Sequence, residues 1–446
     1  MRMRRNATLV FLLGFFAGPL LATGPRAQPP AQAPAQVTAR GKIAEINVSG
    51  SQKYAREQIA EASGLKIGDM AGREEIQAAA DRLAQLGVFS NVRYRFSSKG
   101  QDLEIEFQLE DAHTYPLYFD NFPWFSDKEI TEAIKKDVPF FDGTAPEQGT
   151  VADDILRAMA ALLKANDIHG EVEASLMVEP GTDVMVQYYH WNGPTLKTGT
   201  IEFTGPGTEF IKQDPGVTQL LRDLIGKPYS RFGVAIFAFE KVRPLFVNRG
   251  ELRVKIEKPV ARFVGDPGKP LPDNVRVTVA VEPGPVYHWG GVTWVGNGAF
   301  AAAELDRHLG LTEGMVAAGD RTQEAWENVR AEYLRRGYVD IKLSAEPVFD
   351  DAAERVSYRV TVAEGPVYRM GELVLTGLSL TAERRLIEAW KIPKGEIFDG
   401  LYFQNFLADA RSKKIFGEMV VTYNEVGHWL RTNAEHRVVD VLLDFK

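Results

Sequence analysis

The sequence predicts an α+β fold of five tandem β-α-α-β-β domains in an elongated rod, each a three-stranded mixed sheet covered on one face by two helices. The first observation is a repeat: GPVY occurs at residues 284–287 and at 365–368, each time before an apolar strand that ends in glycine. The second is the strand that closes each copy, as at 103–109 and 356–362, where apolar and polar residues alternate as in a sheet with one covered face. Between such strands, segments like 321–337 carry apolar residues at the spacing of a half-buried helix. Two helices on three strands are about the smallest α+β arrangement with its own core.

The first residues have the pattern of an export signal. Arg2, Arg4 and Arg5 precede the apolar run LVFLLGFFAGPLLA, which breaks at TGPRAQ. We interpret residues 1–27 as a secretory signal peptide, with an uncleaved amino-terminal anchor as the alternative. Residues 28–41, rich in Pro, Ala and Gln, are expected to form a linker. The chain is therefore expected to be exported.

Composition narrows the function classes. Of the 446 residues, 45% are apolar and 25% are charged, so the chain can bury cores along most of its length. The absence of cysteine excludes disulfides and a thiol nucleophile. A formal net charge of -8 argues against a nucleic-acid-binding surface. The histidines show no metal-ligand spacing, and neither G-x-S-x-G nor a Walker loop occurs, so no enzyme, metal or cofactor is predicted.

The predicted domains span residues 42–111, 112–194, 195–283, 284–364 and 365–446. In four of them the first strand ends in a glycine that we expect to turn the chain into the first helix, namely Gly50, Gly205, Gly296 and Gly377. The second copy has YFDNFPWF where this strand and glycine should be, and its last strand is predicted from Val184, Val186 and Tyr188. The third copy carries a long hairpin insertion, PVARFVGDPGKPLPDN.

One stretch allows a different function. In VTWVGNGAFAAAEL, residues 292–305, Gly296, Gly298 and Ala301 fit the G-x-G-x-x-A form of a dinucleotide fingerprint, with Asp320 at the distance of a ribose ligand. The other copies keep the first glycine, but the second recurs only in the third copy, and Asp320 lies between two predicted helices. We therefore expect a structural turn here, and a dinucleotide-binding enzyme is the less favoured alternative.

Three phrases carry a family resemblance. VAEGPVYRMGELVLTG at 362–377, AEYLRRGYVDIKL at 331–343 and DRLAQLGVFSNVRY at 81–94 resemble the POTRA domain, the polypeptide-transport-associated module of BamA-like outer-membrane assembly proteins. The resemblance covers about residues 42–446. It implies a non-enzymatic periplasmic scaffold for outer-membrane protein assembly or polypeptide transport, at the inner face of the outer membrane and without a cofactor. In that family a membrane barrel follows the repeats, whereas this sequence stops at Lys446. We expect either a protein without a barrel or the periplasmic portion of one whose barrel is truncated or separately encoded.

Sheet edges are the predicted binding surfaces. An edge strand offers unpaired backbone N–H and C=O groups, to which an extended partner can add as a further strand. The resemblance implies such β-augmentation along the second strand of each domain, in NVRYRF, EVEASL, ELRVKI, DIKLSA and EMVVTY. The candidate residues, from the first and fourth of these strands, are Asn91, Val92, Arg93, Tyr94, Asp340, Ile341, Lys342, Leu343 and Ser344. Expected partners are unfolded outer-membrane protein clients, assembly-complex subunits or a separately encoded outer-membrane barrel, and no nucleic acid. The alternative is that charges such as Arg95 and Lys255 only protect these edges from aggregation.

Overall fold

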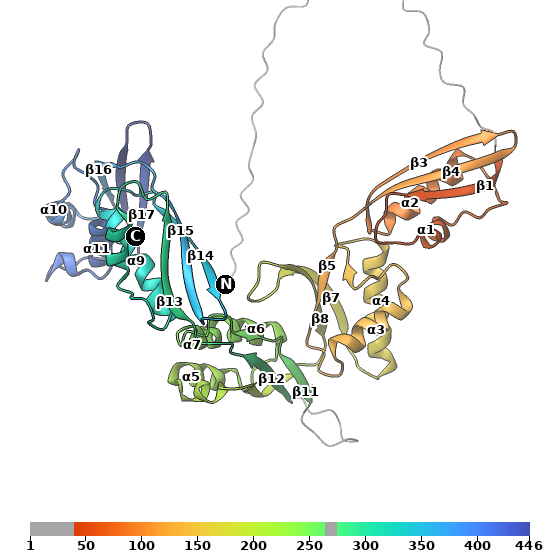
Figure 1. Ribbon diagram of the computed structural model, residues 1–446, viewed down its shortest axis with the longest axis horizontal. Coiled ribbons are helices and arrows are strands. Elements are labelled where there is room, and N and C mark those ends of the chain that lie inside the picture. Colours follow the sequence, from red (N-terminus) through yellow and green to blue (C-terminus); the bar gives the residue numbers. More distant parts are fainter. Residues whose placement is uncertain (1–39, 264–273) are drawn as a thin grey trace, which may run out of the picture. The chain divides into compact units, whose positions relative to one another are not determined.

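The computed structural model describes residues 40–263 and 274–446. The predicted signal peptide, nearly all of the predicted linker and the tip of the hairpin insertion lie outside the described residues. The described chain contains five sheets, and we call each sheet with its helices a module, numbered 1 to 5 in chain order (Figure 1). The chain divides into two compact units. The first is built from the strand up to Gly50 and from Ala55–Leu83 and Val92–Leu109, in module 1, and the second contains modules 2 to 5.

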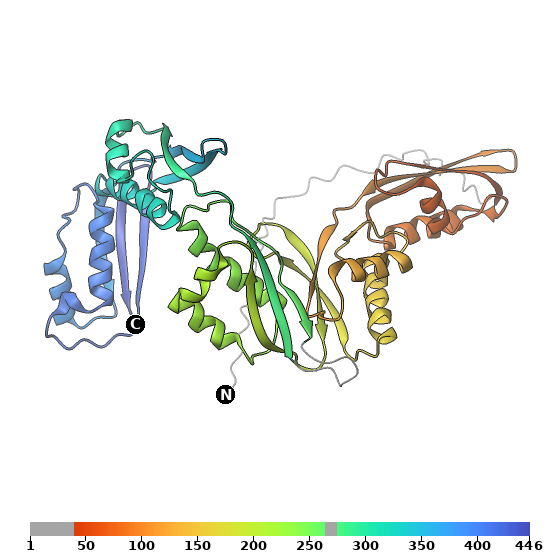
Figure 2. The same ribbon diagram turned by 60° about the horizontal axis from the view of Figure 1, so that its bottom comes forward.

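All five modules share one topology. The last strand lies inside the sheet and pairs parallel with the first strand. In modules 2 to 5 it pairs antiparallel with the second strand. A parallel pair needs a crossover connection, which the helices supply on one face of each sheet (Figure 2). The predicted α+β class and the β-α-α-β-β order are therefore confirmed.

Module 1 follows the predicted pattern closely. Its elements are β1 (Gly41–Ser49), α1 (Arg56–Ser63), β2 (Met70–Ala71), α2 (Arg73–Gln85), β3 (Phe89–Lys99) and β4 (Asp102–Asp111). The sheet order is β2-β1-β4-β3, so β3 is an edge strand. The alternation in β4 places its apolar side chains, Leu103, Ile105, Phe107 and Leu109, in the core.

Module 2 has a sheet that is covered on both faces. Its elements are β5 (Tyr115–Asp120), α3 (Asp127–Asp137), β6 (Thr144–Ala145), α4 (Thr150–Ala165), β7 (Glu171–Val178) and β8 (Met185–Asn192), in the sheet order β6-β5-β8-β7. The last strand predicted from Val184, Val186 and Tyr188 is present as β8, which begins at Met185, but its helix-covered face is not formed by these residues. Tyr189 and Trp191 are buried there instead, and Val186 is buried on the opposite face. Alternation fails in β8 because module 3 covers that opposite face.

Module 3 is the irregular copy. Its elements are β9 (Lys197–Thr204), η1 (Thr208–Gln213), α5 (Pro215–Leu224), α6 (Arg231–Phe237), η2 (Ala238–Val242), α7 (Arg243–Val247), β10 (Lys255–Ile256), β11 (Val260–Phe263) and β12 (Asn274–Glu282). Only Lys255 and Ile256 of the predicted second strand ELRVKI are strand residues. Beyond Pro259, which lacks an N–H to donate, pairing with β12 resumes in β11. This edge is therefore split into two short pieces.

Modules 4 and 5 are regular. Their elements are β13 (His288–Val295), α8 (Ala302–Leu309), α9 (Gly319–Arg335), β14 (Lys342–Asp350), β15 (Arg355–Ala363), β16 (Arg369–Thr376), α10 (Leu380–Ala389), α11 (Gly400–Arg411), η3 (Lys414–Phe416), β17 (Val426–Asn433) and β18 (Val438–Phe445). The sheet orders are β13-β15-β14 and β16-β18-β17. The prediction of EMVVTY as the edge strand of module 5 is wrong, because that segment is a connection in which Val420 is 91% exposed and the strand begins at Val426.

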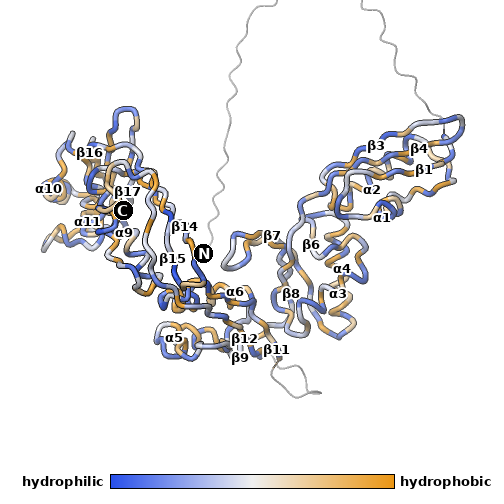
Figure 3. Tube along the Cα trace, in the orientation of Figure 1, coloured by the Kyte–Doolittle hydropathy of each residue, from blue (hydrophilic) through white to orange (hydrophobic). Residues whose placement is uncertain are grey.

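Hydrophobic and hydrophilic residues are interspersed along the strands of the described chain (Figure 3), and they alternate most regularly in the last strands β4, β12, β15 and β18. Each sheet thus presents one apolar face to its helices, as a small α+β core requires. Over residues 40–263 and 274–446, we find no helix with the length and apolar character needed to cross a bilayer.

The predicted turn glycines have a second role that the sequence did not reveal. Gly50, Gly205, Gly296 and Gly377 have φ of 97°, 125°, 85° and 85°, as expected for turns into the first helix. A Cβ at these positions would also lie 2.0, 2.0, 2.5 and 1.9 Å from a carbonyl oxygen in or next to the last strand of the same module. In module 2 the equivalent residue is Asn121, with φ of 65°, one of the few side chains that tolerate this conformation.

Candidate functional site

The predicted edge residues lie largely where β-augmentation would need them. Residues Asn91–Tyr94 are in β3, the edge strand of module 1. Lys342, Leu343 and Ser344 begin β14, the edge strand of module 4. Asp340 and Ile341 do not belong to this strand, contrary to the prediction, because they form the turn before it.

Ile341 instead packs inside module 4, and Asp340 contacts the start of module 5. Ile341 is 5% exposed in the core, and its N–H donates to Tyr338 O. Asp340 accepts a hydrogen bond of 2.7 Å from the hydroxyl of Tyr368, the tyrosine of the second GPVY repeat. The edge that a partner strand could use in module 4 therefore starts at Lys342.

A groove adjoins the edge strand of module 2. The groove lies between α4 and β7 and has a volume of about 650 Å³. Val172, Ala174 and Leu176 of β7 pair in register with the helix-facing residues of β8, yet Ala174 is exposed and the other two are half-buried. Helix α4 therefore covers β8 but leaves the helix-facing side of β7 exposed.

Two buried polar atoms at this groove have no hydrogen-bond partner among the described residues. Gln187 and Tyr189 of β8 are 3% and 0% exposed. Neither the Oε1 of Gln187 nor the hydroxyl of Tyr189 has a partner among the described residues. Burial raises the pKa of Tyr189, so the hydroxyl stays protonated. Buried polar atoms usually find partners, so this groove is a candidate for polar recognition.

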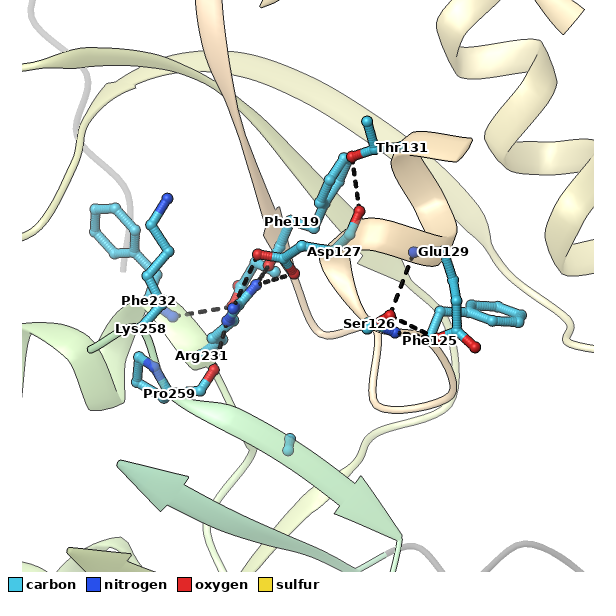
Figure 4. A network of polar contacts seen from close by, with 12 residues as sticks. Phe119, Phe125, Ser126, Asp127, Glu129, Thr131, Arg231, Phe232, Lys258 and Pro259 are labelled. Atoms are coloured by element: carbon cyan, nitrogen blue, oxygen red, sulfur yellow. Dashed lines mark hydrogen bonds and ion pairs between the residues drawn. The ribbon is translucent and has the colours of Figure 1, made fainter. Parts of the chain in front are cut away.

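A buried arginine fixes the joint between modules 2 and 3 (Figure 4). Arg231, at the start of α6, has a side chain that is 11% exposed. Its guanidinium donates to both carboxylate oxygens of Asp127 at 2.7 and 3.1 Å, to Phe119 O at 2.9 Å and to Pro259 O at 2.6 Å. Bidentate pairing of this kind fixes geometry as well as charge. Pro259 lies between β10 and β11, so this hydrogen bond also ties Arg231 to the point where the edge strand of module 3 is interrupted.

A buried carboxylate adds a second set of bonds at this joint. Asp120, at the end of β5, has a side chain that is 1% exposed. It accepts from the backbone N–H of Phe232 at 2.9 Å and from the hydroxyl of Ser230 at 3.4 Å, both in module 3. Within module 2 it accepts from Tyr188 and contacts Nδ1 of His190 at 3.2 Å. The hydrogen bond to Asp120 raises the pKa of His190 above its ordinary value.

The other joints of the second unit use the repeated tyrosine instead. The N–H of Tyr287 donates to Gly250 O, and the N–H of Tyr368 donates to Gly337 O. Each acceptor glycine follows the last helix of the preceding module, and both tyrosine side chains are 1% exposed. The GPVY repeat therefore marks a joint contact, whereas the joint between modules 2 and 3 is built on Asp120 and Arg231.

Sequence reasoning missed the joint between modules 2 and 3. Its signal was present in YFDNFPWF, where polar Asp120 and Asn121 replace the strand end and glycine of the other copies. By itself, this departure predicts only an irregular copy of the repeat. The arginine lies more than a hundred residues later, so no local pattern joined it to these residues.

The dinucleotide alternative meets a specific obstacle at residues 292–305. The carboxylate of Glu364 accepts a hydrogen bond of 2.8 Å from the N–H of Ala299, in the turn where a pyrophosphate would bind. A Cβ on Gly298 would meet only the end of the Glu364 side chain, at 3.4 Å, so no close backbone approach requires this glycine. Asp320 lies in the first turn of α9, not after a second parallel strand. Across the described residues, no group of three or more His, Asp or Glu is placed to bind a metal ion.

Comparisons with known proteins agree with the fold. The POTRA family model, described as surface antigen variable number repeat, matches residues 41–111 and 287–365. A Treponema pallidum (strain Nichols) protein named "Putative outer membrane protein assembly factor" is 24% identical over 263 residues, which are 58% of this chain and 30% of that protein. The chain thus spans less than a third of that relative.

Solved structures give low-scoring matches. The crystal structure of Haemophilus influenzae BamA POTRA3-5 is 18% identical and covers 56% of this chain and 96% of that one, with a TM-score of 0.41. POTRA1-3 of the periplasmic domain of Omp85 from Anabaena is 14% identical and covers 73% and 96%, with a TM-score of 0.20. These TM-scores are too low for a comparison of how modules are arranged. The POTRA family model thus matches modules 1 and 4, and the chain is similar to a protein named "Putative outer membrane protein assembly factor".

Proposed function

We propose that residues 42–446 form five POTRA-like domains, divided near residues 112, 195, 284 and 365, and that they act as a non-enzymatic periplasmic scaffold. The scaffold serves outer-membrane protein assembly or polypeptide transport, and it binds strands of clients or of assembly-complex subunits by β-augmentation. The name of the Treponema pallidum relative supports the assembly role. The short connections between successive sheets support the domain boundaries.

One observation carries the binding mechanism. The second strand lies at the sheet edge in modules 1, 2, 4 and 5, as β3, β7, β14 and β17. These strands are eight to eleven residues long, so each could pair with an extended segment of similar length. The split edge of module 3 offers only four residues in β11, beside a break whose carbonyl already accepts from Arg231. Four of the five edges are therefore suited to adding a strand.

Photo-cross-linking in cells tests this function. A photoreactive residue at Ser344 of β14 is expected to capture outer-membrane proteins or assembly subunits, and equivalent probes on β3, β7 and β17 extend the test. The same probe at Arg330, on the exposed surface of α9, is the control and should capture far fewer. Capture from none of the four edge strands, with the protein present at normal levels, would refute strand binding.

A further inference from the structure

The groove between α4 and β7 has a charge of one sign. Three charged residues line it, Glu147, Asp153 and Glu173, and all three are acidic and exposed. Glu147 and Asp153 flank the start of α4, opposite the edge strand. Glu173 pairs in register with His190, so its side chain points to the other face of the sheet and borders the same edge. Glu173 also accepts a hydrogen bond of 3.0 Å from Asn192 on that other face, so a segment lying in the groove would meet the carboxylates of Glu147 and Asp153 on its α4 side.

The groove also presents hydrogen-bond acceptors at its base. The Oε1 of Gln187 accepts only, and the hydroxyl of Tyr189 can accept or donate. Because both atoms are buried and unpartnered, a donor that reached them would recover a hydrogen bond that the free protein does not make. Carboxylates around the groove and neutral oxygen atoms inside it favour the same kind of ligand, one rich in donors.

The apolar part of the groove fits long side-chain stems. Leu156 of α4 and Val172 and Leu176 of β7 line it and are half-buried. Lysine and arginine bury their methylene stems on such surfaces and keep their charged ends with polar partners. Ala174, between the two apolar residues of β7, is small and exposed, which leaves room above the strand.

From these observations, and resting on the proposed function, we propose that the α4–β7 groove of module 2 selects basic strands. The ligand is an extended segment that pairs with β7 through its backbone and carries lysine or arginine on the side that faces α4. Glu147 and Asp153 attract these cations, and Gln187 and Tyr189 accept from the donors that enter the groove. Module 2 would thereby discriminate among partner strands, which backbone pairing alone does not do.

Binding of labelled peptides to the full chain tests the proposal. The probes are three fluorescein-labelled peptides in which valine alternates with lysine, glutamine or glutamate. The lysine peptide is expected to bind about tenfold more tightly than the glutamine peptide, and the glutamate peptide more weakly than either. High salt should reduce the difference, because exposed charges are screened. Equal affinity of the lysine and glutamate peptides at low salt would overturn the selectivity while leaving strand binding intact.

Variants assign the selectivity to this groove. The double variant Glu147→Gln, Asp153→Asn is expected to remove most of the lysine preference, whereas Glu240→Gln, an exposed acid of module 3, should leave it unchanged. Tyr189→Phe removes only the unpartnered hydroxyl, so it should leave thermal unfolding unchanged or raise its midpoint and still weaken the lysine peptide severalfold. A lysine preference that survives all of these groove variants would refute the assignment.

A backbone-blocked probe separates the two proposals. The lysine peptide with alternate amides N-methylated keeps its charge but cannot pair with an edge strand. Loss of its binding is expected. Binding that persists after methylation would contradict β-augmentation in this groove, which is a failure of the proposed function and not only of the charge selectivity.

Discussion

Replacing Arg231 by methionine is expected to loosen the joint between modules 2 and 3. The substitution keeps much of the apolar stem of the side chain and removes every N–H donor of the guanidinium. Phe119 O and Pro259 O each lose a hydrogen bond, at about 1 to 1.5 kcal/mol apiece. The ion pair adds at most about 1 kcal/mol, because the side chain of Asp127 is 46% exposed and can return to water. The expected loss is about 2 to 4 kcal/mol in total.

Hydrogen exchange of the full chain measures this loss locally, which suits a protein with several cores. Amides of α6, among them the Phe232 N–H that Asp120 accepts, should exchange about 30-fold to 1000-fold faster in the variant. Asp127→Asn should cost less than Arg231→Met, since it leaves the carbonyl bonds in place. Arg222→Met, on the exposed surface of α5, is the matched control. If the α6 amides of Arg231→Met kept the same protection from hydrogen exchange as the parent, the conclusion that this arginine stabilises the joint would be refuted.

Three further outcomes follow from the turns and the buried carboxylate. Gly377→Ala should destabilise module 5 by several kcal/mol in urea unfolding, because the new Cβ would lie 1.9 Å from a carbonyl oxygen. Gly395→Ala, where φ is 86° and no atom lies near the new Cβ, should cost only about 1 to 2 kcal/mol. Equal losses of stability in the two variants would contradict the argument from the close carbonyl oxygen. Asn121→Gly should leave the stability of module 2 within about 1 kcal/mol of the parent, whereas a large loss would show that the asparagine side chain matters beyond its backbone conformation. In the folded protein the pKa of His190 is raised above 6.5, so the protonated imidazole beside Asp120 stabilises the joint. This stabilisation is fully present below about pH 6.5 and is lost as the pH rises through the raised pKa. Exchange rates of α6, corrected for intrinsic pH dependence, should show this loss in the parent and not in His190→Gln.

The regular parts of the fold could be predicted because one physical requirement repeats in each copy. A sheet with one covered face imposes alternation on its central strand, so β4, β12, β15 and β18 were identifiable by inspection. The turn glycines were found in the same way, through their constant position after the first strand. That they also approach a carbonyl oxygen closely is a property of the folded chain.

The edge strand of module 5 shows where hydrophobicity misleads. EMVVTY is apolar but forms a connection, in which Tyr423 reaches the core and Val420 does not. The true edge strand, β17, buries only Val426, because an edge strand with an open outer face needs few apolar residues. Its identity comes from pairing with β18, which propensity alone does not reveal.

The joint between modules 2 and 3 could not be predicted, because the residues that form it are distant in sequence and do not recur in the other copies of the repeat. In β8 both faces are occupied, so the alternation that identifies the other last strands is absent. The groove likewise depends on where α4 lies relative to β7, and periodicity does not determine this. The edge strand EVEASL could therefore be predicted from its sequence, whereas the unpartnered oxygen atoms of Gln187 and Tyr189 in the groove could not.

The burial of Asp120 has a consequence for how this protein can be divided or recombined. Two of the donors to its carboxylate, the Phe232 N–H and the Ser230 hydroxyl, belong to the following module. A fragment cut between modules 2 and 3 would expose this carboxylate to solvent without those donors and uncover the second face of β8. A chimera that exchanged module 2 alone would have to find an equivalent of Ser230, Arg231 and Phe232 in its new neighbour. The smallest segment of this region that could be moved into another protein with these contacts intact is therefore the pair of modules 2 and 3, although the repeat suggests that each copy is interchangeable.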